Sequence, residues 1–413
     1  MTHQKPYANM PFHYGWLIVV TGTLCIFACL GLGRFALGML LPSMANTLKL
    51  TYAQMGYIST GNFIGYLLAV FISGNFAQRF GARLTIFLAL LLVGTSMMLV
   101  GRANGFLFAL FLYFLTGLGS GASNVPMMGL VSAWFTRNKR GKAAGFIVIG
   151  SGFAIVFSGK FIPFINEKFG TEGWRVSWLI LGVTVIVIAF LCVLLLRNKP
   201  QDLGLTAVGS ENSINSTANI ENFKITNIYK SGIIYHLGTI YFLFGYTYVI
   251  YATFIVTTLV KERGIPESVA GNFWSAVGLF SLLSGPVFGT LSDRLGRKTG
   301  LILVFLFQFI SYLLVATKLP GIFLYLSIFF FGVVAWSIPS IMAAAVGDYV
   351  GPQKAAQAFG FITFIFGIGQ IAGPSIAGIL AEKSGSFASS FYMAAVFAAI
   401  AIFLSFLLKK PND

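Results

Sequence analysis

The sequence predicts an all-α integral membrane protein with twelve transmembrane helices in two similar halves. The chain has 413 residues, of which 57% are hydrophobic and only 9% are charged. A soluble protein of this length would need far more charge on its surface. The apolar runs reach the roughly 20 residues that a helix needs to cross a bilayer. In addition, the second half repeats the first at a constant distance along the chain.

This repeat has an offset of 215 residues and needs no insertion. The matching pairs spread over several predicted helices: Gly74 and Gly289, Arg79 and Arg294, Gly81 and Gly296, Gly117 and Gly332, Ala143 and Ala358, Gly152 and Gly367. Internal repeats in a hydrophobic chain are typical of secondary transporters, whose binding sites lie between the repeats. We therefore expect two pseudo-symmetric six-helix bundles.

Six apolar runs follow one another in each half. In the first half they are 14–41, 52–76, 84–101, 105–134, 141–166 and 176–196; in the second they are 232–260, 268–291, 300–316, 320–347, 354–381 and 387–408. The first run is too long for the apolar part of a cleavable signal peptide. The chain is expected to divide into an N-terminal bundle, 1–196, a connecting segment, 197–231, and a C-terminal bundle, 232–413.

Basic residues indicate which ends of the spans face the cytoplasm. The chain carries 27 Lys and Arg against 11 Asp and Glu, a net charge of +16. Most of these cations, including Arg79 and Arg140, belong to loops on the side of the N-terminus. The positive-inside rule then puts both termini in the cytoplasm, so the basic excess reflects topology and not a nucleic-acid partner. The polar segment 197–231 is predicted to be a flexible cytoplasmic linker.

Two cations, Arg34 and Lys160, fall inside apolar runs, whereas all acidic residues lie outside the spans or at their ends. A charge at the bilayer centre costs about 2.5–3.5 kcal/mol on insertion scales, and such residues usually mark a pathway. With no acidic partner in the bilayer interior, an anionic ligand is the natural counter-charge. We expect Arg34 to bind it, because a guanidinium can hold a carboxylate through two hydrogen bonds. The alternative is that Arg34 reaches the outer surface or binds backbone carbonyls.

Helical spacing puts Arg34 on one face of the first span with Phe27, Gly31 and Gly38, and we expect the glycines to leave room for a ligand. Lys160 lies near the end of the fifth span, where reaching the outer interface is the alternative to a site role. A lysine that loses its proton in an apolar cavity can take up a proton together with an anion. Lys160 and His236, near the start of the seventh span, are therefore candidates for proton coupling.

The loop after the eighth span reads Gly289-Thr-Leu-Ser-Asp293-Arg294-Leu-Gly296-Arg297-Lys298. A carboxylate at the end of an apolar helix, a tight glycine turn and then cations resemble the loop signature of the major facilitator superfamily. That signature also follows the second helix, where Gln78 here replaces the acid. The resemblance implies that the acid helps to close the cytoplasmic side. We expect either a weakened latch at Gln78 or a tolerated surface substitution. The expected gating residues are Gln78, Arg79, Arg83, Arg140, Asp293, Arg294 and Arg297.

Four further segments resemble the monocarboxylate transporter and oxalate/formate antiporter branch of that superfamily. They are Tyr14-Gly15-Trp16, the stretch from Trp134-Phe135-Thr136 to Gly145, Gly173-Trp174-Arg175, and the stretch from Arg197-Asn198-Lys199-Pro200 to Leu205. Gly33-Arg34-Phe35 with Leu41-Pro42 is also similar to a poorly characterised bacterial branch with an Arg-Phe motif in helix 1. The resemblance implies transport of a mono- or dicarboxylate. One departure is that 268–291 contains no Arg or Lys, where monocarboxylate transporters usually carry a cation.

The superfamily resemblance also implies that helices 1, 4, 7 and 10 line a central cavity that opens to alternate sides. Polar and aromatic side chains at helical spacing on these spans are candidates to orient the substrate. Together with Arg34 they are Tyr113, Ser120, Asn124, Tyr241, Tyr248, Tyr251, Trp336 and Ser340. Each could instead be a packing residue or an interhelical hydrogen bond.

No catalytic motif, metal-ligand cluster or phosphate loop is found in the sequence, so we expect no enzyme activity, metal or cofactor. The main prediction is a secondary active transporter for a small organic anion, working by alternating access as proton symport or anion exchange. The alternative is an efflux transporter for neutral or anionic amphipathic compounds, which the 16% aromatic content would suit. The expected partners are the substrate, the lipid bilayer and protons or a counter-anion. We expect a monomer in a bacterial inner membrane.

Overall fold

Long apolar helices make up nearly all of the protein. The computed structural model describes residues 12–210, 228–317, 319–351 and 353–409. Eleven helical segments in these ranges are long and apolar enough to cross a membrane, and one of them, 138–195, has 58 residues. That segment contains two helices separated by a 3-10 turn at Gly170–Glu172. Because about 20 residues cross a bilayer, it supplies two crossings. The predicted all-α membrane fold is confirmed.

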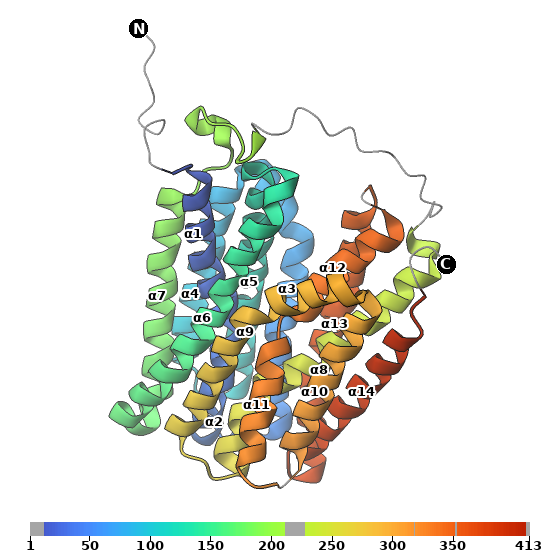
Figure 1. Ribbon diagram of the computed structural model, residues 1–413. Helices are drawn as coiled ribbons and strands as arrows, with labels where there is room; N and C mark the ends of the chain where they lie inside the picture. The colour runs from blue at the N-terminus through green and yellow to red at the C-terminus, as the bar shows by residue number, and fades with distance from the viewer. Residues whose placement is uncertain (1–11, 211–227, 318, 352, 410–413) are drawn as a thin grey trace. The chain divides into compact units, whose positions relative to one another are not determined.

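Figure 1 labels the helices. The first repeat contains α1 (Gly15–Ile26), a π-helix (Phe27–Phe35), α2 (Ala36–Leu48), α3 (Tyr52–Phe80), α4 (Ala82–Val100), α5 (Phe106–Trp134), α6 (Arg137–Phe169) and α7 (Gly173–Leu195). The second contains α8 (Gly232–Thr257), a π-turn (Thr258–Glu262), α9 (Glu267–Leu295), α10 (Arg297–Ala316), α11 (Ile322–Val334), α12 (Ser337–Val350), α13 (Ala355–Ser384) and α14 (Ala388–Phe406). Several helices run past the predicted spans, since a helix continues through polar residues where hydropathy has already fallen.

Two spans are interrupted. The first changes from α- to π-helix and back, and π-segments in membrane helices are often found at functional sites. The tenth breaks between α11 and α12, where the N–H of Trp336 donates to Ser284 Oγ at 3.1 Å. Pro339 then falls in the first turn of α12, where its missing N–H leaves no helical hydrogen bond unmade.

Helix boundaries reproduce the offset of 215 residues. Helix α3 covers Tyr52–Phe80 and α9 covers Glu267–Leu295, while α4 begins at Ala82 and α10 at Arg297. The turns between these helices also match, because Gly81 and Gly296 have φ of +83° and +90°. Residues other than glycine rarely adopt this conformation. The repeat is therefore structural and not only a pattern in the sequence.

The chain packs as two compact units. The described residues of the first are 12–36, 64–155 and 165–210, and those of the second are 37–63, 156–164, 228–317, 319–351 and 353–409. The second unit thus includes parts of the first, second and fifth spans, although these belong to the first repeat. Its central element runs from Gly232 to Glu262, and 94% of the apolar window in this element is buried; α13 and α14 pack against α8.

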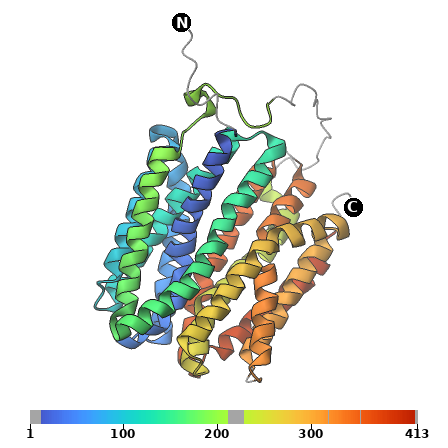
Figure 2. The ribbon, with the colours of Figure 1, turned by 60° about the vertical axis from the view of Figure 1, so that its left-hand side comes forward.

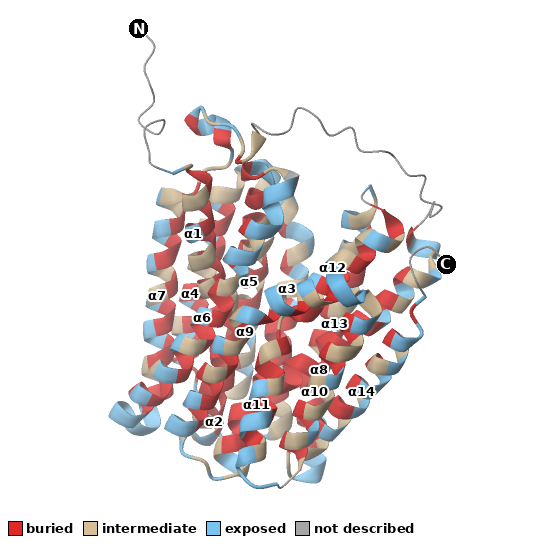
Figure 3. Cartoon of the chain, viewed as in Figure 1, coloured by how far each residue is buried: buried red, intermediate tan, exposed pale blue. Residues whose placement is uncertain are grey.

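Outward-facing surfaces of the helices are apolar. Figure 3 colours many of these positions as exposed, and they include large side chains such as Leu107, Leu283 and Phe403, with exposed fractions of 74%, 62% and 61%. Apolar surface on this scale would cause aggregation in water, whereas lipid chains cover it without cost. The exposed belt agrees with an integral membrane protein.

The start of the connecting segment is folded, so the prediction of a flexible linker is wrong for 197–210. The N–H of Val208 donates to the carbonyl of Trp134 at 2.9 Å, and the N–H of Thr136 donates back to Val208 at 3.1 Å. The indole N–H of Trp134 reaches the carbonyl of Arg197 at 2.9 Å. These bonds use backbone groups that composition does not reveal. Residues 211–227 of the predicted linker lie outside the described residues.

Candidate functional site

The buried cation of the first span lies within the first compact unit. Arg34 belongs to the π-helix, and only 9% of its surface is exposed. Its guanidinium carbon is 4.3 Å from the ring centroid of Tyr66 on α3. The phenol of Tyr113 on α5 donates to the backbone carbonyl of Arg34 at 2.9 Å. Two helices thus hold the arginine: α5 through its backbone and α3 through a cation–π contact.

Tyr66 is linked to a second predicted site residue. The side-chain N–H of Asn124 on α5 donates to the phenol oxygen of Tyr66 at 2.7 Å. Asn124 and Tyr66 are both partly exposed. Arg34, Tyr66 and Asn124 therefore form one polar group, here called the arginine cluster, on three helices. Sequence spacing missed Tyr66, because spacing relates residues of one helix and not neighbours on different helices.

Glycines beside Arg34 do not leave space for a ligand, which corrects the sequence-based expectation. A Cβ at Gly31 would lie 2.1 Å from the Cβ of Ala154 on α6, and a Cβ at Gly38 would lie 2.7 Å from the carbonyl oxygen of Ala252 on α8. Both glycines let helices approach closely. The shared face that was predicted also assumed an unbroken α-helix, whereas the π-helix has a different number of residues per turn.

Ser120, another predicted lining residue, serves the π-helix. Its hydroxyl lies 2.7 Å from the carbonyl oxygen of Cys29 and 2.8 Å from that of Thr116. Ser120 has no exposed surface. The hydroxyl therefore supports backbone carbonyls of the interrupted span.

The predicted aromatic residues of the second repeat lie in the second compact unit. Tyr241 and Tyr248 flank Phe366 of α13, with ring centroids at 4.3 Å and 6.1 Å and nearly parallel planes. The amide of Gln370 donates to the phenol of Tyr248 at 2.5 Å, and the ring of Trp336 meets that of Tyr248 edge-on at 5.8 Å. These five residues form a second group, here called the aromatic cluster.

Two other predicted residues of this repeat are placed elsewhere. Tyr251 is fully buried, stacks on Phe331 at 4.0 Å and shares a hydrogen bond of 3.0 Å with Ser327. Its surroundings are those of a packing residue. Ser340 on α12 is exposed.

The two candidates for proton coupling both contact other helices. The ammonium of Lys160 donates to the side-chain oxygen of Asn272 on α9, and Lys160 is exposed. A ring nitrogen of His236 lies 2.9 Å from the carbonyl oxygen of Leu404 on α14. Both contacts lie within the second compact unit.

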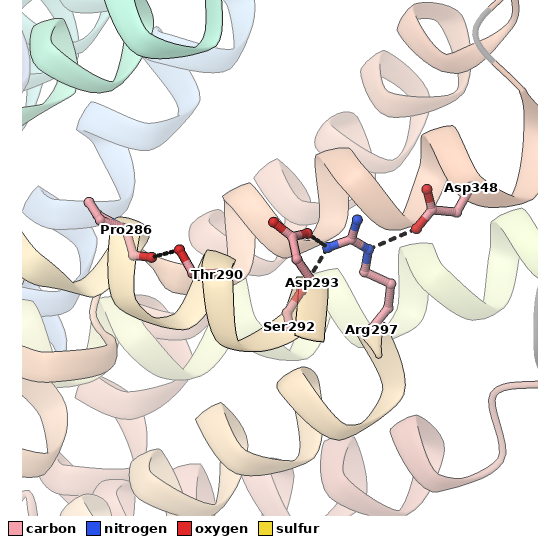
Figure 4. A network of polar contacts seen from close by, with 6 residues as sticks. All are labelled: Pro286, Thr290, Ser292, Asp293, Arg297 and Asp348. Carbon is pink, nitrogen blue, oxygen red and sulfur yellow. Dashed lines mark hydrogen bonds and ion pairs between the residues drawn. The ribbon is translucent and has the colours of Figure 1, made fainter. Parts of the chain in front are cut away.

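The signature loop of the second repeat carries an ion-pair network (Figure 4). Arg297, at the start of α10, pairs with Asp293 of α9 and with Asp348 of α12, the latter at 2.7 Å. The guanidinium also donates to Ser292 Oγ at 2.9 Å. This network joins the ends of three helices. Arg294 is exposed beside it.

The first repeat lacks this network. The positions equivalent to Asp293, Arg297 and Asp348 are Gln78, Ala82 and Ala133. Gln78 is exposed. The two repeats therefore differ at more than the replacement of the acid by Gln78, because all three charged residues of the network are absent from the first repeat.

Other predicted gating cations bind within the first repeat. Arg83 donates through Nε to the carbonyl of Val193 at 2.5 Å, which ties α4 to α7. Arg140 donates to the carbonyls of Phe135 and Ser132 at 2.9 and 2.8 Å, at the end of α5. Arg79 is exposed, with its guanidinium 5.3 Å from the ring of Phe80. Arg83 and Arg140 thus satisfy helix-end carbonyls.

Residues in the segments that resemble the monocarboxylate branch connect the ends of helices. The phenol of Tyr14 donates to the carbonyl of Leu195 at 2.8 Å, and its ring lies 5.6 Å from that of Trp134. Arg175 donates to the carbonyls of Gly101 and Ala103 at 3.0 and 2.8 Å. These residues tie helix ends together within the first unit, so their presence reports the fold more than the substrate. Within the described residues, no group of three or more His, Cys, Asp or Glu could hold a metal.

Solved structures with this fold are transporters. The protein superposes on a bacterial homologue of the human lysosomal transporter Spinster with a TM-score of 0.75 at 16% identity, covering 95% of this chain and 96% of that chain. It superposes on the nucleoside transporter NupG with a TM-score of 0.71 at 15% identity, covering 96% and 98%. At these identities the likeness concerns the fold alone. The fold is that of a major facilitator superfamily transporter.

Relatives by sequence agree. The hexuronate transporter of Bacillus subtilis is 26% identical, covering 92% of each chain. Monocarboxylate transporter 2 of Rattus norvegicus is 22% identical over 91% of this chain and 78% of the relative, and a probable sulfoacetate transporter of Cupriavidus necator is 21% identical over 89% and 88%. Residues 26–406 match the family described as the uncharacterised MFS-type transporter YbfB, and the chain belongs to this family. The predicted superfamily is confirmed; the protein is a transporter and not an enzyme.

Proposed function

We propose that this protein is a secondary active transporter that carries a small organic anion by alternating access. The observation that carries the proposal is the arginine cluster. Its cation, Arg34, is nearly buried, and all acidic residues of the sequence lie outside the predicted spans or at their ends. Burying a charge is costly unless a partner of opposite charge or a polar environment compensates for it. A guanidinium held in this position can bind the anionic group of a substrate through charge-assisted hydrogen bonds.

The names of the relatives favour a carboxylate. Hexuronate, monocarboxylates and sulfoacetate all contain a carboxylate group, and a guanidinium binds this group through two parallel hydrogen bonds. We propose that Arg34 binds the carboxylate, that Tyr66 and Asn124 hold the guanidinium in place, and that Tyr113 and Ser120 fix the backbone beneath it. In the second repeat, we propose that Tyr241, Tyr248 and Trp336 contact the remainder of the substrate; Tyr251 and Ser340 remain secondary candidates.

The orientation and coupling are proposed on charge alone. Loops on the side of the N-terminus carry most of the Lys and Arg, so we propose that both termini are cytoplasmic in a bacterial inner membrane. We propose that the two repeats, 1–196 and 232–413, are the moving halves of a monomer. Proton symport and anion exchange both remain candidates, with Lys160 and His236 as the titratable groups to vary.

The test is uptake by proteoliposomes of labelled glucuronate, lactate, sulfoacetate and, as a neutral control, glucose. Wild type and Arg34→Gln are compared with and without an inward proton gradient, and with and without internal unlabelled anion. We expect saturable uptake of at least one carboxylate, no uptake of glucose, and loss of the signal in Arg34→Gln. Dependence on the proton gradient would indicate symport, and dependence on internal anion would indicate exchange.

A matched control is Arg175→Gln. Arg175 lies at the end of the bundle and binds carbonyls of the 101–105 loop, so its loss removes an arginine without touching the arginine cluster. If Arg34→Gln transports carboxylates as well as wild type does, the anion proposal is wrong. Efflux of neutral or anionic amphipathic compounds would then be the function to screen.

A further inference from the structure

Two similar contacts between helices, here called joints, lie within the second compact unit. Each joint connects a helix of the first repeat to a helix of the second. In one joint α3 crosses α13; in the other α9, drawn in yellow in Figure 2, contacts the 156–164 segment of α6. Both joints lie toward the end of the bundle that carries the connections 49–51, 263–266 and 385–387, here called the distal end. Neither joint was foreseen from the sequence.

Each joint centres on a glycine that lies against the backbone of the facing helix. A Cβ at Gly56 of α3 would lie 2.3 Å from the carbonyl oxygen of Pro374. A Cβ at Gly271 of α9 would lie 2.1 Å from the carbonyl oxygen of Gly159. These distances leave no space for any side chain, so both crossings are contacts of backbone on backbone, as small residues permit in membrane helices.

In each joint a hydroxyl also donates to a backbone carbonyl of the other repeat. Thr60 of α3, one turn after Gly56, donates to the carbonyl of Ile371 at 2.9 Å. Ser275 of α9, one turn after Gly271, donates to the carbonyl of Val156 at 3.0 Å. A carbonyl inside an α-helix already accepts one bond, and its second lone pair accepts the hydroxyl. These bonds therefore break without unfolding any helix.

The two joints are equivalent under the repeat. Gly56 and Gly271, Thr60 and Ser275, Val156 and Ile371, and Gly159 and Pro374 are pairs separated by 215 residues. Donor, acceptor and glycine thus match position by position, which a chance contact would not produce. The neighbouring side-chain contacts differ, because Lys160 binds Asn272 in one joint, whereas Ser375, the equivalent of Lys160, lies 2.7 Å from Thr60 Oγ1 in the other.

We propose that Thr60 and Ser275 are twin latches that hold the distal end closed and set how often it opens during transport. Alternating access requires the end that is closed in one state to separate in the other. Close contacts between backbones lose a quarter to a half of their attraction over a gap of about 0.5–1 Å, so a small separation already weakens the joints. The bonds from Thr60 and Ser275 to backbone carbonyls are directional contacts that oppose separation, one in each joint, and they act together with the contacts of Lys160 with Asn272 and of Ser375 with Thr60.

The experiment measures how fast a cysteine behind the latches reacts with a membrane-impermeant maleimide. The reporter is Ser59→Cys, at a position with 3% exposure, after replacement of the three native cysteines, all of which are buried. Labelling is followed in intact cells or sided proteoliposomes, with reagent on the distal side. We expect Thr60→Val and Ser275→Ala each to raise the labelling rate about threefold and the double variant about tenfold, since an interhelical hydrogen bond in a membrane contributes about a factor of three.

The matched control is Thr85→Val. Thr85 has the same exposed fraction as Thr60, 8%, but its hydroxyl binds the carbonyl of Gly81 next to its own helix, at 2.9 Å. It should label at the wild-type rate. A second pair tests the joint itself: Gly271→Ala should label at least tenfold faster, whereas Gly129→Ala, whose added methyl meets nothing within 4 Å, should not.

Rapid labelling of Gly271→Ala with wild-type rates for Thr60→Val, Ser275→Ala and their double variant would overturn the latch proposal. Wild-type rates for all variants would also overturn it, because the joints would then not control opening. If Gly271→Ala does not fold, the hydroxyl variants alone decide. The assay needs no substrate, so its result is independent of whether the protein carries an organic anion.

Discussion

Gly31→Ala distinguishes a packing role from a binding role for the glycine next to the arginine cluster. The added methyl would lie 2.1 Å from the Cβ of Ala154, whereas the next atoms, Ala154 Cα and the carbonyl oxygen of Ile26, are both at 3.6 Å. The collision is therefore with a single methyl group. Overpacking of a tight interface costs roughly 1–3 kcal/mol, so we expect Gly31→Ala to lower the thermal midpoint of the protein in detergent.

Ala154→Gly should reverse that loss in the double variant. Moving one methyl from α6 to the first span removes the collision and leaves ordinary contacts. The helix-propensity terms of the two changes, about 1 kcal/mol each and opposite in sign, nearly cancel. We expect Ala154→Gly alone to lower the midpoint modestly, and the double variant to return close to the wild-type value.

Fluorescence-detected size-exclusion chromatography after heating measures all four proteins in one series. If Gly31 instead makes room for substrate, Gly31→Ala keeps the wild-type midpoint, loses uptake and is not rescued by Ala154→Gly. A double variant no more stable than Gly31→Ala would refute the packing argument.

Three other predictions follow from the contacts. Tyr66→Leu removes the cation–π contact, worth about 1–2 kcal/mol when desolvated, and should raise KM for the anion roughly five- to thirtyfold in uptake assays. Tyr66→Phe keeps the ring and should raise KM only a few-fold. Equal KM values in wild type and Tyr66→Leu would contradict the role of the ring. A double-mutant cycle of Arg297→Gln and Asp348→Asn, read from thermal midpoints, should give a coupling energy of about 0.5–1 kcal/mol. This energy should fall with added salt, because the Asp348 side chain is 42% exposed. A coupling energy of zero at low salt would show that the ion pair does not stabilise the protein. Val208→Asp puts a charge on a buried side chain that lies against Gly15 and should speed trypsin cleavage within 197–199. Unchanged cleavage would show that the folded segment does not depend on this buried side chain.

Hydropathy and the constant offset were sufficient to predict the fold. A long apolar run can cross lipid only as a helix, since every backbone group must be paired, and the offset identified which helices of the two halves are equivalent. The glycines at the turns, Gly81 and Gly296, were recognised in the sequence, whereas the predicted runs 52–76 and 268–291 stopped short of the ends of α3 and α9. These properties depend on local sequence, which is why they were readable.

The candidate site was less predictable because it depends on contacts between helices. Arg34 was identified from its charge, but Tyr66 was not, since nothing in the sequence relates α3 to the π-helix. No sequence rule predicted the π-helix itself, so the face assigned to Gly31 and Gly38 was wrong. The folded segment 197–210 was misjudged because its composition is polar, whereas backbone hydrogen bonds to Trp134 and Thr136 hold it.

The matching helix boundaries give this chain an alignment with itself. Positions that are alike in both copies, such as the turn glycines and the hydroxyls of Thr60 and Ser275, are under structural constraints that the two halves share. Positions that differ are under constraints that apply to one half alone. By this comparison the arginine cluster belongs to the first copy only, because its counterparts in the second are Val249, Ser281 and Pro339. Under the proposed function, an ancestral duplication left the two halves with a common scaffold, and the cation that we propose to bind the substrate arose in the first half alone.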